Sequence, residues 1–99
     1  MTFKVRFTTE ASNDLVRLYE FAANNDPQAA DRAFNTIDNA WRVLEEFPFS
    51  CRKAEGGDPF IRELVIPFGA SGYVALFEIE GESTVTILAV RHQLEDDYH

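Results

Sequence analysis

The stretch FIRELVIPFGASGYVALFEIEGESTVTILAVRH, residues 60–92, decides the fold because it contains three consecutive strand-like runs. Each run is rich in aromatic and β-branched residues, which favour strands. Pro67–Gly72 predicts the first turn, and Gly81-Glu82 predicts a tight hairpin before the last strand. Strands joined by such short turns pair in antiparallel fashion. The three predicted strands are Phe60–Ile66, Tyr73–Glu80 and Thr84–Val90.

Upstream of this stretch, the chain predicts two amphipathic helices. A hydroxyl at Thr8 or Thr9 can cap the first helix. Asp26-Pro27 offers the second helix a cap followed by proline at its first position, and Pro48 ends that helix. The short connection between the helices predicts an antiparallel hairpin. The apolar stripes comprise Ala11, Leu15, Leu18, Tyr19 and Ala22 in the first helix, and Ala30, Ala33, Phe34, Ile37, Trp41 and Leu44 in the second.

The N-terminal residues add one more strand. Phe3–Phe7 alternates apolar and basic residues, which is the pattern of a half-buried strand. Residues 48–59 contain Gly56-Gly57 and a proline at each end, so they predict a surface loop. The whole chain, residues 1–99, is therefore predicted to form a single α+β domain with the element order β-α-α-β-β-β. Its helical hairpin is expected to pack on one face of a small antiparallel sheet.

Composition narrows the possible function classes. The formal charge of −8, from 9 basic and 17 acidic residues, opposes broad binding to a nucleic-acid backbone. A hydrophobic content of 45% excludes an intrinsically disordered chain. The sequence has no apolar run long enough to span a bilayer, and its N-terminus does not resemble a secretory signal. Cys51 is the only cysteine and can form no internal disulfide, so we expect a cytoplasmic location.

A metal site and a cofactor site are both considered and not predicted. The possible metal ligands are His92, Glu95, Asp96 and His99. They lie in one short C-terminal run, whereas metal sites need ligands that converge from a rigid frame. Acidic residues in such a run are more often solvated charge. Gly69–Gly72 precedes a strand rather than a helix, so it does not predict a phosphate loop.

Three residues with functional chemistry lie in or at the end of apolar strands. Arg62 and Arg91 are the only basic residues in residues 60–99, and His92 follows Arg91. One interpretation is structural, through solvation at the sheet edge or ion pairing with Glu63 and neighbouring acids. The other places both arginines on the sheet face opposite the helices, as anchors for a carboxylate or phosphate. Tyr98 then either flanks that face or packs the C-terminal segment down.

The ordered motifs of the chain resemble the ParE/RelE toxins of bacterial type II toxin–antitoxin pairs. Residues 7–15, FTTEASNDL, resemble the family's first strand and helix start, with Thr9 in place of the usual proline. Residues 29–48 resemble its second helix and the proline that stops it. The closing strands are similar at Arg62-Glu63-Leu64, Gly72–Phe77 and Val85–His92. The resemblance covers essentially the whole chain.

The resemblance implies a plasmid-stabilisation-like toxin that is neutralised by a small cognate antitoxin. Such an antitoxin has a ribbon-helix-helix-like N-terminal domain, which would contact DNA for the pair. Its C-terminal segment would wrap the toxin and fold on binding. No membrane partner and no cofactor are implied.

The resemblance also implies a choice between two modes of action. ParE-like members poison DNA gyrase, while RelE-like members cleave mRNA on the ribosome with basic and aromatic groups on the sheet. Val74 and Phe77 stand where a basic residue and a tyrosine are often found, which favours ParE-like, non-enzymatic action. The alternatives are an attenuated, non-toxic homologue that binds only its antitoxin, or a RelE-like endoribonuclease. The nuclease would use Arg62, Arg91, His92 and Tyr98.

Overall fold

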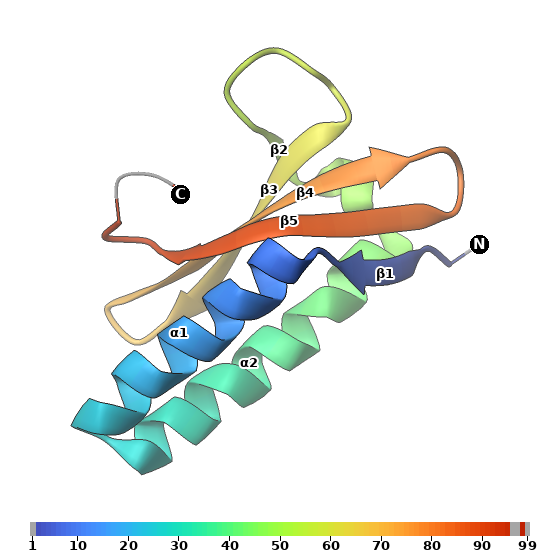
Figure 1. Ribbon diagram of the computed structural model, residues 1–99. Coiled ribbons are helices and arrows are strands. Elements are labelled where there is room, and N and C mark those ends of the chain that lie inside the picture. Colours follow the sequence, from blue (N-terminus) through green and yellow to red (C-terminus); the bar gives the residue numbers. More distant parts are fainter. Residues whose placement is uncertain (1, 96–97, 99) are drawn as a thin grey trace.

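The computed structural model describes residues 2–95 and residue 98. Its elements follow the order expected for the α+β class, with two additions between the second helix and the long strands. The elements are β1 (Lys4–Phe7), α1 (Thr9–Asn25), α2 (Pro27–Glu46), the 3-10 turn η1 (Pro48–Ser50), β2 (Arg52–Lys53), β3 (Ile61–Phe68), β4 (Ser71–Glu80) and β5 (Thr84–His92). The two helices lie side by side on one face of the sheet (Figure 1).

Both helices begin at the residues that the sequence indicates. The Thr8 hydroxyl accepts the Ala11 N–H at 3.0 Å. The Asp26 carboxylate accepts the N–H groups of Gln28 and Ala29 at 3.1 and 3.2 Å, with Pro27 at the first helical position. Each such cap stabilises its helix by about 1 kcal/mol. Because Asp26 alone separates α1 from α2, the predicted antiparallel hairpin is confirmed.

The sheet is mixed rather than wholly antiparallel, so that part of the prediction is wrong. Its strand order is β1-β5-β4-β3-β2, and β1 runs parallel to β5. The chain between β1 and β5 passes through both helices and strands β2 to β4, and this long path allows the parallel pairing, which a short turn could not. The predicted loop 48–59 also contains η1 and β2. The two residues of β2 are too few to show an alternating pattern in the sequence.

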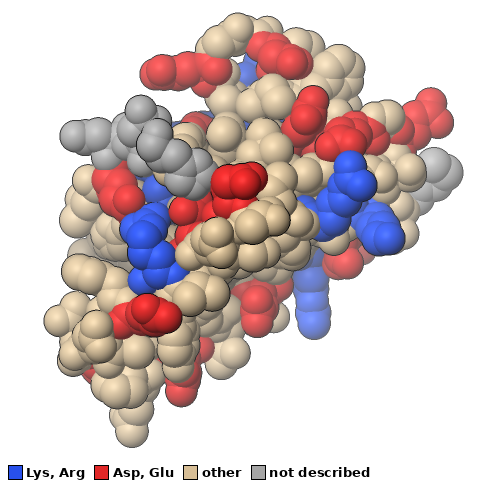
Figure 2. Space-filling view, in the orientation of Figure 1, with Lys and Arg blue, Asp and Glu red and all other residues tan. Residues whose placement is uncertain are grey.

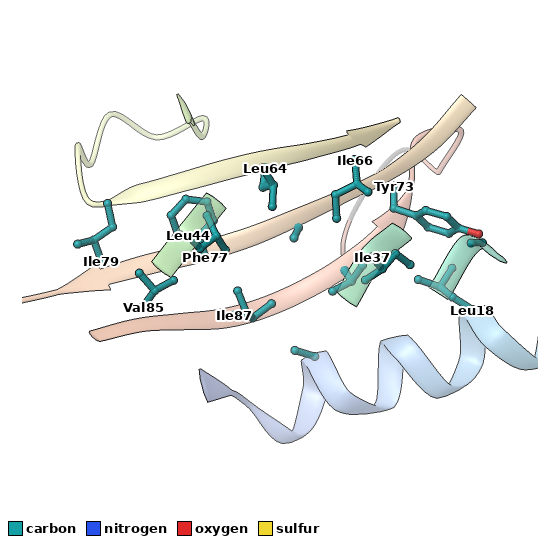
Figure 3. Packing of buried hydrophobic residues seen from close by; sticks show 14 residues of the cluster. Leu18, Ile37, Leu44, Leu64, Ile66, Tyr73, Phe77, Ile79, Val85 and Ile87 are labelled. Carbon is teal, nitrogen blue, oxygen red and sulfur yellow. The ribbon is translucent and has the colours of Figure 1, made fainter. Parts of the chain in front are cut away.

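The hydrophobic core lies between the helices and one face of the sheet, here called the helix face. Tyr73, Phe77 and Ile79 of β4 point toward the helices, and the Tyr73 ring reaches toward Leu18 (Figure 3). Phe77 is fully buried. The other buried members of this cluster are Ala11, Ala33, Ile37, Leu44, Leu64, Ile66, Ala75, Val85, Ile87 and Val90.

A β-bulge in β5 decides which of its last residues face the core. Leu76 pairs with Ala89, whereas the next residue, Phe77, pairs with Ile87, so Leu88 is an extra residue. Such an insertion shifts the alternation of side chains along the strand. Beyond the bulge, Val90 therefore faces the helices. Arg91 faces the opposite, open face.

Side chains of α1 satisfy the edge of β5 beyond the point where β1 ends. The Thr8 hydroxyl donates to the Leu88 carbonyl at 3.1 Å, and the buried Asp14 carboxylate accepts the Val90 N–H at 2.9 Å. Two residues further along the same edge, the Glu95 carboxylate accepts the His92 N–H at 2.9 Å. The edge is thus capped by side chains instead of by a strand.

Among the described residues, no helix is long and apolar enough to cross a membrane.

Candidate functional site

The open face of the sheet brings together charged residues from three strands. Residues paired directly across two strands point to the same face. Arg91 pairs with Val74, and Glu63 pairs with both Leu76 and Arg52. All of these alternate with the helix-facing residues, so Arg52, Glu63 and Arg91 share the open face.

These side chains and Tyr98 form a continuous chain of contacts, here called the Arg91 cluster (Arg52, Glu63, Arg91 and Tyr98). The Arg91 guanidinium carbon lies 4.9 Å from the centre of the Tyr98 ring, which is a cation–π contact. The Tyr98 hydroxyl donates to Glu63 Oε2. Arg52 Nε donates to Glu63 Oε1 at 2.9 Å. The cluster borders a hollow of about 540 Å³, which also contacts Ala54, Glu55, Ile61 and Leu76.

Arg91 uses its guanidinium unevenly. Its Nη1 donates to the carbonyls of His92, Gln93 and Glu95 at 3.3, 3.4 and 2.7 Å. Its Nε is buried and has no hydrogen-bond partner among the residues that the structure describes. A buried donor without an acceptor costs about 1–3 kcal/mol. Arg91 therefore organises the turn after β5 while one of its donors stays unsatisfied.

Tyr98 remains a hydrogen-bond donor well above neutral pH. Burial raises the pKa of its phenol, and the hydrogen bond and negative charge of Glu63 raise that pKa further. The neighbouring Arg91 guanidinium opposes the shift only in part. At neutral pH the Tyr98 hydroxyl is therefore protonated and engaged with Glu63. This geometry matches both alternatives left open for Tyr98, because it flanks the open face and also ties the C-terminal segment to it.

Arg62 lies on the helix face, so of the two interpretations left open for it, the one that places it opposite the helices is wrong. It pairs with the buried Phe77. Its Nε donates to the Pro59 carbonyl at 2.9 Å. Its Nη1 donates to the carbonyls of Phe49 and Cys51 at 3.1 and 2.8 Å, and its guanidinium carbon lies 5.3 Å from the Phe49 ring centre. Arg62 thus fastens η1 and the segment before β3 to the sheet.

His92 also points to the helix face, away from the Arg91 cluster. It pairs with Tyr73, and the two ring centres lie 5.5 Å apart. Its Nδ1 accepts the Leu94 N–H at 3.1 Å, and its Nε2 lies 3.1 Å from Ser71 Oγ. An Nδ1 that accepts leaves the ring proton on Nε2, which then donates to the Ser71 hydroxyl.

The structure contains no cluster of three or more metal-ligating side chains within residues 2–95 and 98. Both ring nitrogens of His92 already have neighbours, and Glu95 Oε1 lies 3.4 Å from Arg17 as well as accepting the His92 N–H. Asp96 and His99, the other ligands considered, lie outside the described residues. Basic side chains form separate patches among acidic ones on the face drawn in Figure 2. Nothing on that face resembles a continuous track for a phosphate backbone.

A second, apolar groove of about 520 Å³ runs between α1 and the end of β5. Two large apolar side chains beside it are strongly exposed, Phe21 at 72% and Leu94 at 79%. Its lining residues are Arg17, Leu18, Phe21, Ala22, Tyr73, His92, Leu94 and Glu95. His92 therefore belongs to this groove and not to the Arg91 cluster.

Sequence reasoning missed Arg52 and underused Glu63 as members of the cluster. Arg52 lies in a segment that the sequence predicts as loop, and its position on the open face depends on its pairing with Glu63. From the sequence, Glu63 is expected only as an ion-pair partner of Arg62 or Arg91. A signal was present, because Arg62-Glu63 is a charged pair inside an otherwise apolar run. In a strand, one of two neighbouring residues must face away from the core.

Comparisons with known proteins point to one family. Residues 5–97 match the family described as "ParE toxin of type II toxin-antitoxin system, parDE". Two relatives come from Caulobacter vibrioides (strain ATCC 19089 / CIP 103742 / CB 15). Toxin RelE1 is 36% identical over 95 residues, which are 96% of this chain and 98% of that protein. Toxin RelE3 is 34% identical over 92 residues, which are 92% of this chain and 95% of that protein.

Solved structures support the same fold. A structure titled "Chromosomal ParDE TA system from P. aeruginosa" superimposes with a TM-score of 0.73. The alignment covers 91% of this chain and 95% of that chain, at 20% sequence identity. At that identity, the likeness establishes the arrangement of helices and strands.

Proposed function

This chain belongs to the ParE/RelE family of type II toxin–antitoxin toxins, and we propose that it acts on DNA gyrase by protein binding rather than by cutting RNA. Membership of the family implies a cognate antitoxin as partner. We assign the target contact to Arg91 and Tyr98 on the open face. Arg62 and His92 are assigned to supporting the fold, since their polar atoms are used within the chain.

The pairing of Arg91 with Val74 is the observation that carries this proposal. Beside the Arg91 guanidinium at the end of β5, the neighbouring strand β4 carries Val74, an aliphatic residue that is 2% exposed. Phe77 is 0% exposed on the helix face, so position 77 has no access to the open face. RNA cleavage needs groups that transfer protons and stabilise charge on a phosphate. The open face around Arg91 is better suited to binding than to such chemistry.

Ribosome-dependent mRNA cleavage is the second candidate, because Arg91 and Tyr98 do meet on the open face. The two relatives are also named RelE toxins. In that case the guanidinium would stabilise phosphate charge, and the phenol would serve as a proton donor. An attenuated homologue that binds only its antitoxin is the third candidate.

Induced expression of the chain without its antitoxin separates these candidates. Gyrase poisoning predicts elongated cells and trapped gyrase–DNA cleavage complexes, both relieved by co-expression of the antitoxin. Arg91→Ala should weaken the phenotype, while Arg6→Ala provides a matched control on the same face. Immediate translation arrest, with mRNA cut at ribosomal A-sites, would contradict the proposal and support the nuclease. Normal growth with retained antitoxin binding would support the attenuated homologue.

We further propose that the antitoxin's C-terminal segment covers the apolar groove beside α1. Monomeric proteins rarely leave large apolar side chains such as Phe21 and Leu94 together on the surface without a partner. An amphipathic segment that folds on binding would bury them. This location leaves the Arg91 cluster on the other face of the sheet.

Phe21→Asp tests this second assignment. It should weaken antitoxin binding about tenfold or more, because a central buried aromatic residue dominates such interfaces. Val16→Asp is the matched control, since Val16 lies on the same helix, is 57% exposed and does not line the groove. Equal binding by the two variants, measured by titration calorimetry, would show that the antitoxin docks elsewhere.

A further inference from the structure

Arg91 differs from the other arginines that contact the sheet in the state of its Nε donor. Arg6 Nε donates to Thr86 Oγ1 at 2.9 Å, and Arg52 Nε donates to Glu63 Oε1 at 2.9 Å. Arg62 Nε donates to the Pro59 carbonyl at 2.9 Å. Arg91 Nε alone among these four is buried without an acceptor in the part of the chain that the structure describes. Such groups are rare in native proteins, and a functional role is one recognised reason for keeping one.

The Arg91 guanidinium is covered by a side chain from the end of the chain. The Tyr98 ring lies over the guanidinium, and the Tyr98 hydroxyl is tied to Glu63 Oε2. An aromatic ring offers a guanidinium its π face but no acceptor in the guanidinium plane. The ring therefore lies over the guanidinium without supplying the acceptor that the buried Nε lacks.

We propose that Arg91 is a binding site for a protein carboxylate, and that Tyr98 is its built-in, displaceable cover. When Tyr98 moves aside, Nε and a terminal nitrogen of Arg91 can pair with the two oxygens of an aspartate, a glutamate or a chain terminus. Tyr98 in the closed state lies over Arg91 in the hollow through which that ligand would reach the guanidinium edge. The inference rests on the proposed function only in treating the open face as a contact surface for a partner. It does not depend on which protein that partner is.

A carboxylate fits this site better than a phosphate does. Glu63 and Glu55 line the same hollow, so they would repel a dianionic phosphate more strongly than a singly charged carboxylate. One guanidinium edge also matches the two coplanar oxygens of a carboxylate. The cover fits a reversible role, since the interactions that hold it over Arg91 include an aromatic contact and a hydroxyl bond, and both are non-covalent. A partner's carboxylate would replace the aromatic contact with two charge-assisted hydrogen bonds.

The arginine Nε–Hε resonances of the full-length ¹⁵N-labelled chain provide a direct test. Acetate is the probe, and inorganic phosphate at equal ionic strength is the comparison. The Arg91 signal in Tyr98→Ala should shift saturably with acetate at a concentration about tenfold lower than in the unmodified chain, because the closed state reduces apparent affinity. Tyr98→Phe keeps the ring but loses the bond to Glu63, so its response should be intermediate. The Arg6 and Arg62 signals serve as internal controls.

Three outcomes would overturn the proposal. Equal acetate responses of Arg91 in the unmodified chain and in Tyr98→Ala would show that Tyr98 is not a cover. No response of Arg91 in either protein would show that there is no carboxylate site. A stronger response to phosphate than to acetate in Tyr98→Ala would reassign the ligand class. Unchanged Arg6 and Arg62 signals in Tyr98→Ala would exclude misfolding as the cause, and none of these readouts requires the chain to be toxic.

Discussion

Arg62 and Arg91 are the two basic residues of the strand-rich half of the chain, and the two faces of the sheet use them in opposite ways. On the helix face, Arg62 donates to three loop carbonyls and stacks on Phe49. On the open face, Arg91 also donates to three carbonyls through Nη1, but its Nε, under the Tyr98 ring, has no hydrogen-bond partner among the described residues. The first arginine is committed to structure. The second has one donor that these bonds leave unused, so residue type alone does not show which arginine is available for a contact.

The largest expected effect tests whether the helix face carries most of the stability. Phe77→Ala should lower the free energy of unfolding by about 3–5 kcal/mol, because it removes a fully buried ring from the core. Leu76→Ala, at the neighbouring position on the open face, should cost less than half as much. Urea denaturation of both variants measures the difference. Equal losses would mean that the open face is as important to folding as the core.

A smaller effect is expected when the structural arginine is removed. Arg62→Ala should lower the free energy of unfolding by about 2 kcal/mol, because three carbonyls lose hydrogen bonds to a charged donor. Its effect on toxicity should be no greater than this loss of stability explains. If Arg62→Ala folded with normal stability yet lost toxicity, Arg62 would have a functional role of its own.

Arg91→Ala should show the opposite pattern, with a small effect on stability and a larger effect on toxicity. Its removal breaks the bonds from Nη1 to three carbonyls but also removes the unsatisfied Nε, and because these two changes oppose each other, the free energy of unfolding should change by less than about 1 kcal/mol. The affinity for the target should fall about tenfold, which corresponds to ~1.4 kcal/mol of lost contact energy, and a growth assay should show weaker toxicity at equal expression. Lys4→Ala, on the exposed N-terminal strand, is the control. Equal growth effects of the two variants would remove any special role for Arg91.

The smallest expected effect is a dependence on alkaline pH. Because the pKa of Tyr98 is raised in the folded chain, the unfolded chain releases its phenol proton first as the pH rises. The contribution of Tyr98 is therefore fully present below about pH 10, the ordinary tyrosine value, and is lost as the pH rises toward the raised pKa. Tyr98→Phe should flatten the fall in stability above pH 10. Identical pH profiles for the two proteins would show that the bond to Glu63 is not maintained.

Local signals in the sequence were sufficient to predict the helices. Thr8, Asp26-Pro27 and Pro48 each act on the backbone within one turn of themselves, so the start and end of each helix could be derived without knowing the rest of the fold. The apolar stripes likewise predicted most of the core that the helices cover. The predicted order of the helices and strands was also confirmed, because it follows from the same local signals.

Features that depend on pairing between distant segments could not be predicted. The parallel match of β1 with β5 and the two-residue β2 exist only through their neighbours. Arg62 was placed on the wrong face because alternation within a short charged run does not show which residue starts on the core side. The Arg91 cluster shows the same limit, since Arg52 and Tyr98 reach it from segments without a strand pattern in the sequence.

The β-bulge at Leu88 determines which residue at the end of β5 is exposed on the open face. If all residues of β5 were kept but paired without the bulge, the alternation that buries Val85 and Ile87 would continue through Ala89 to Arg91, and His92 would face outward. The same Arg-His ending can thus present a guanidinium or an imidazole on the open face, depending on whether a bulge precedes it. The pairing of this strand therefore determines, together with its residues, which group the open face offers. Two relatives with identical Arg-His endings can present different chemistry to their partners.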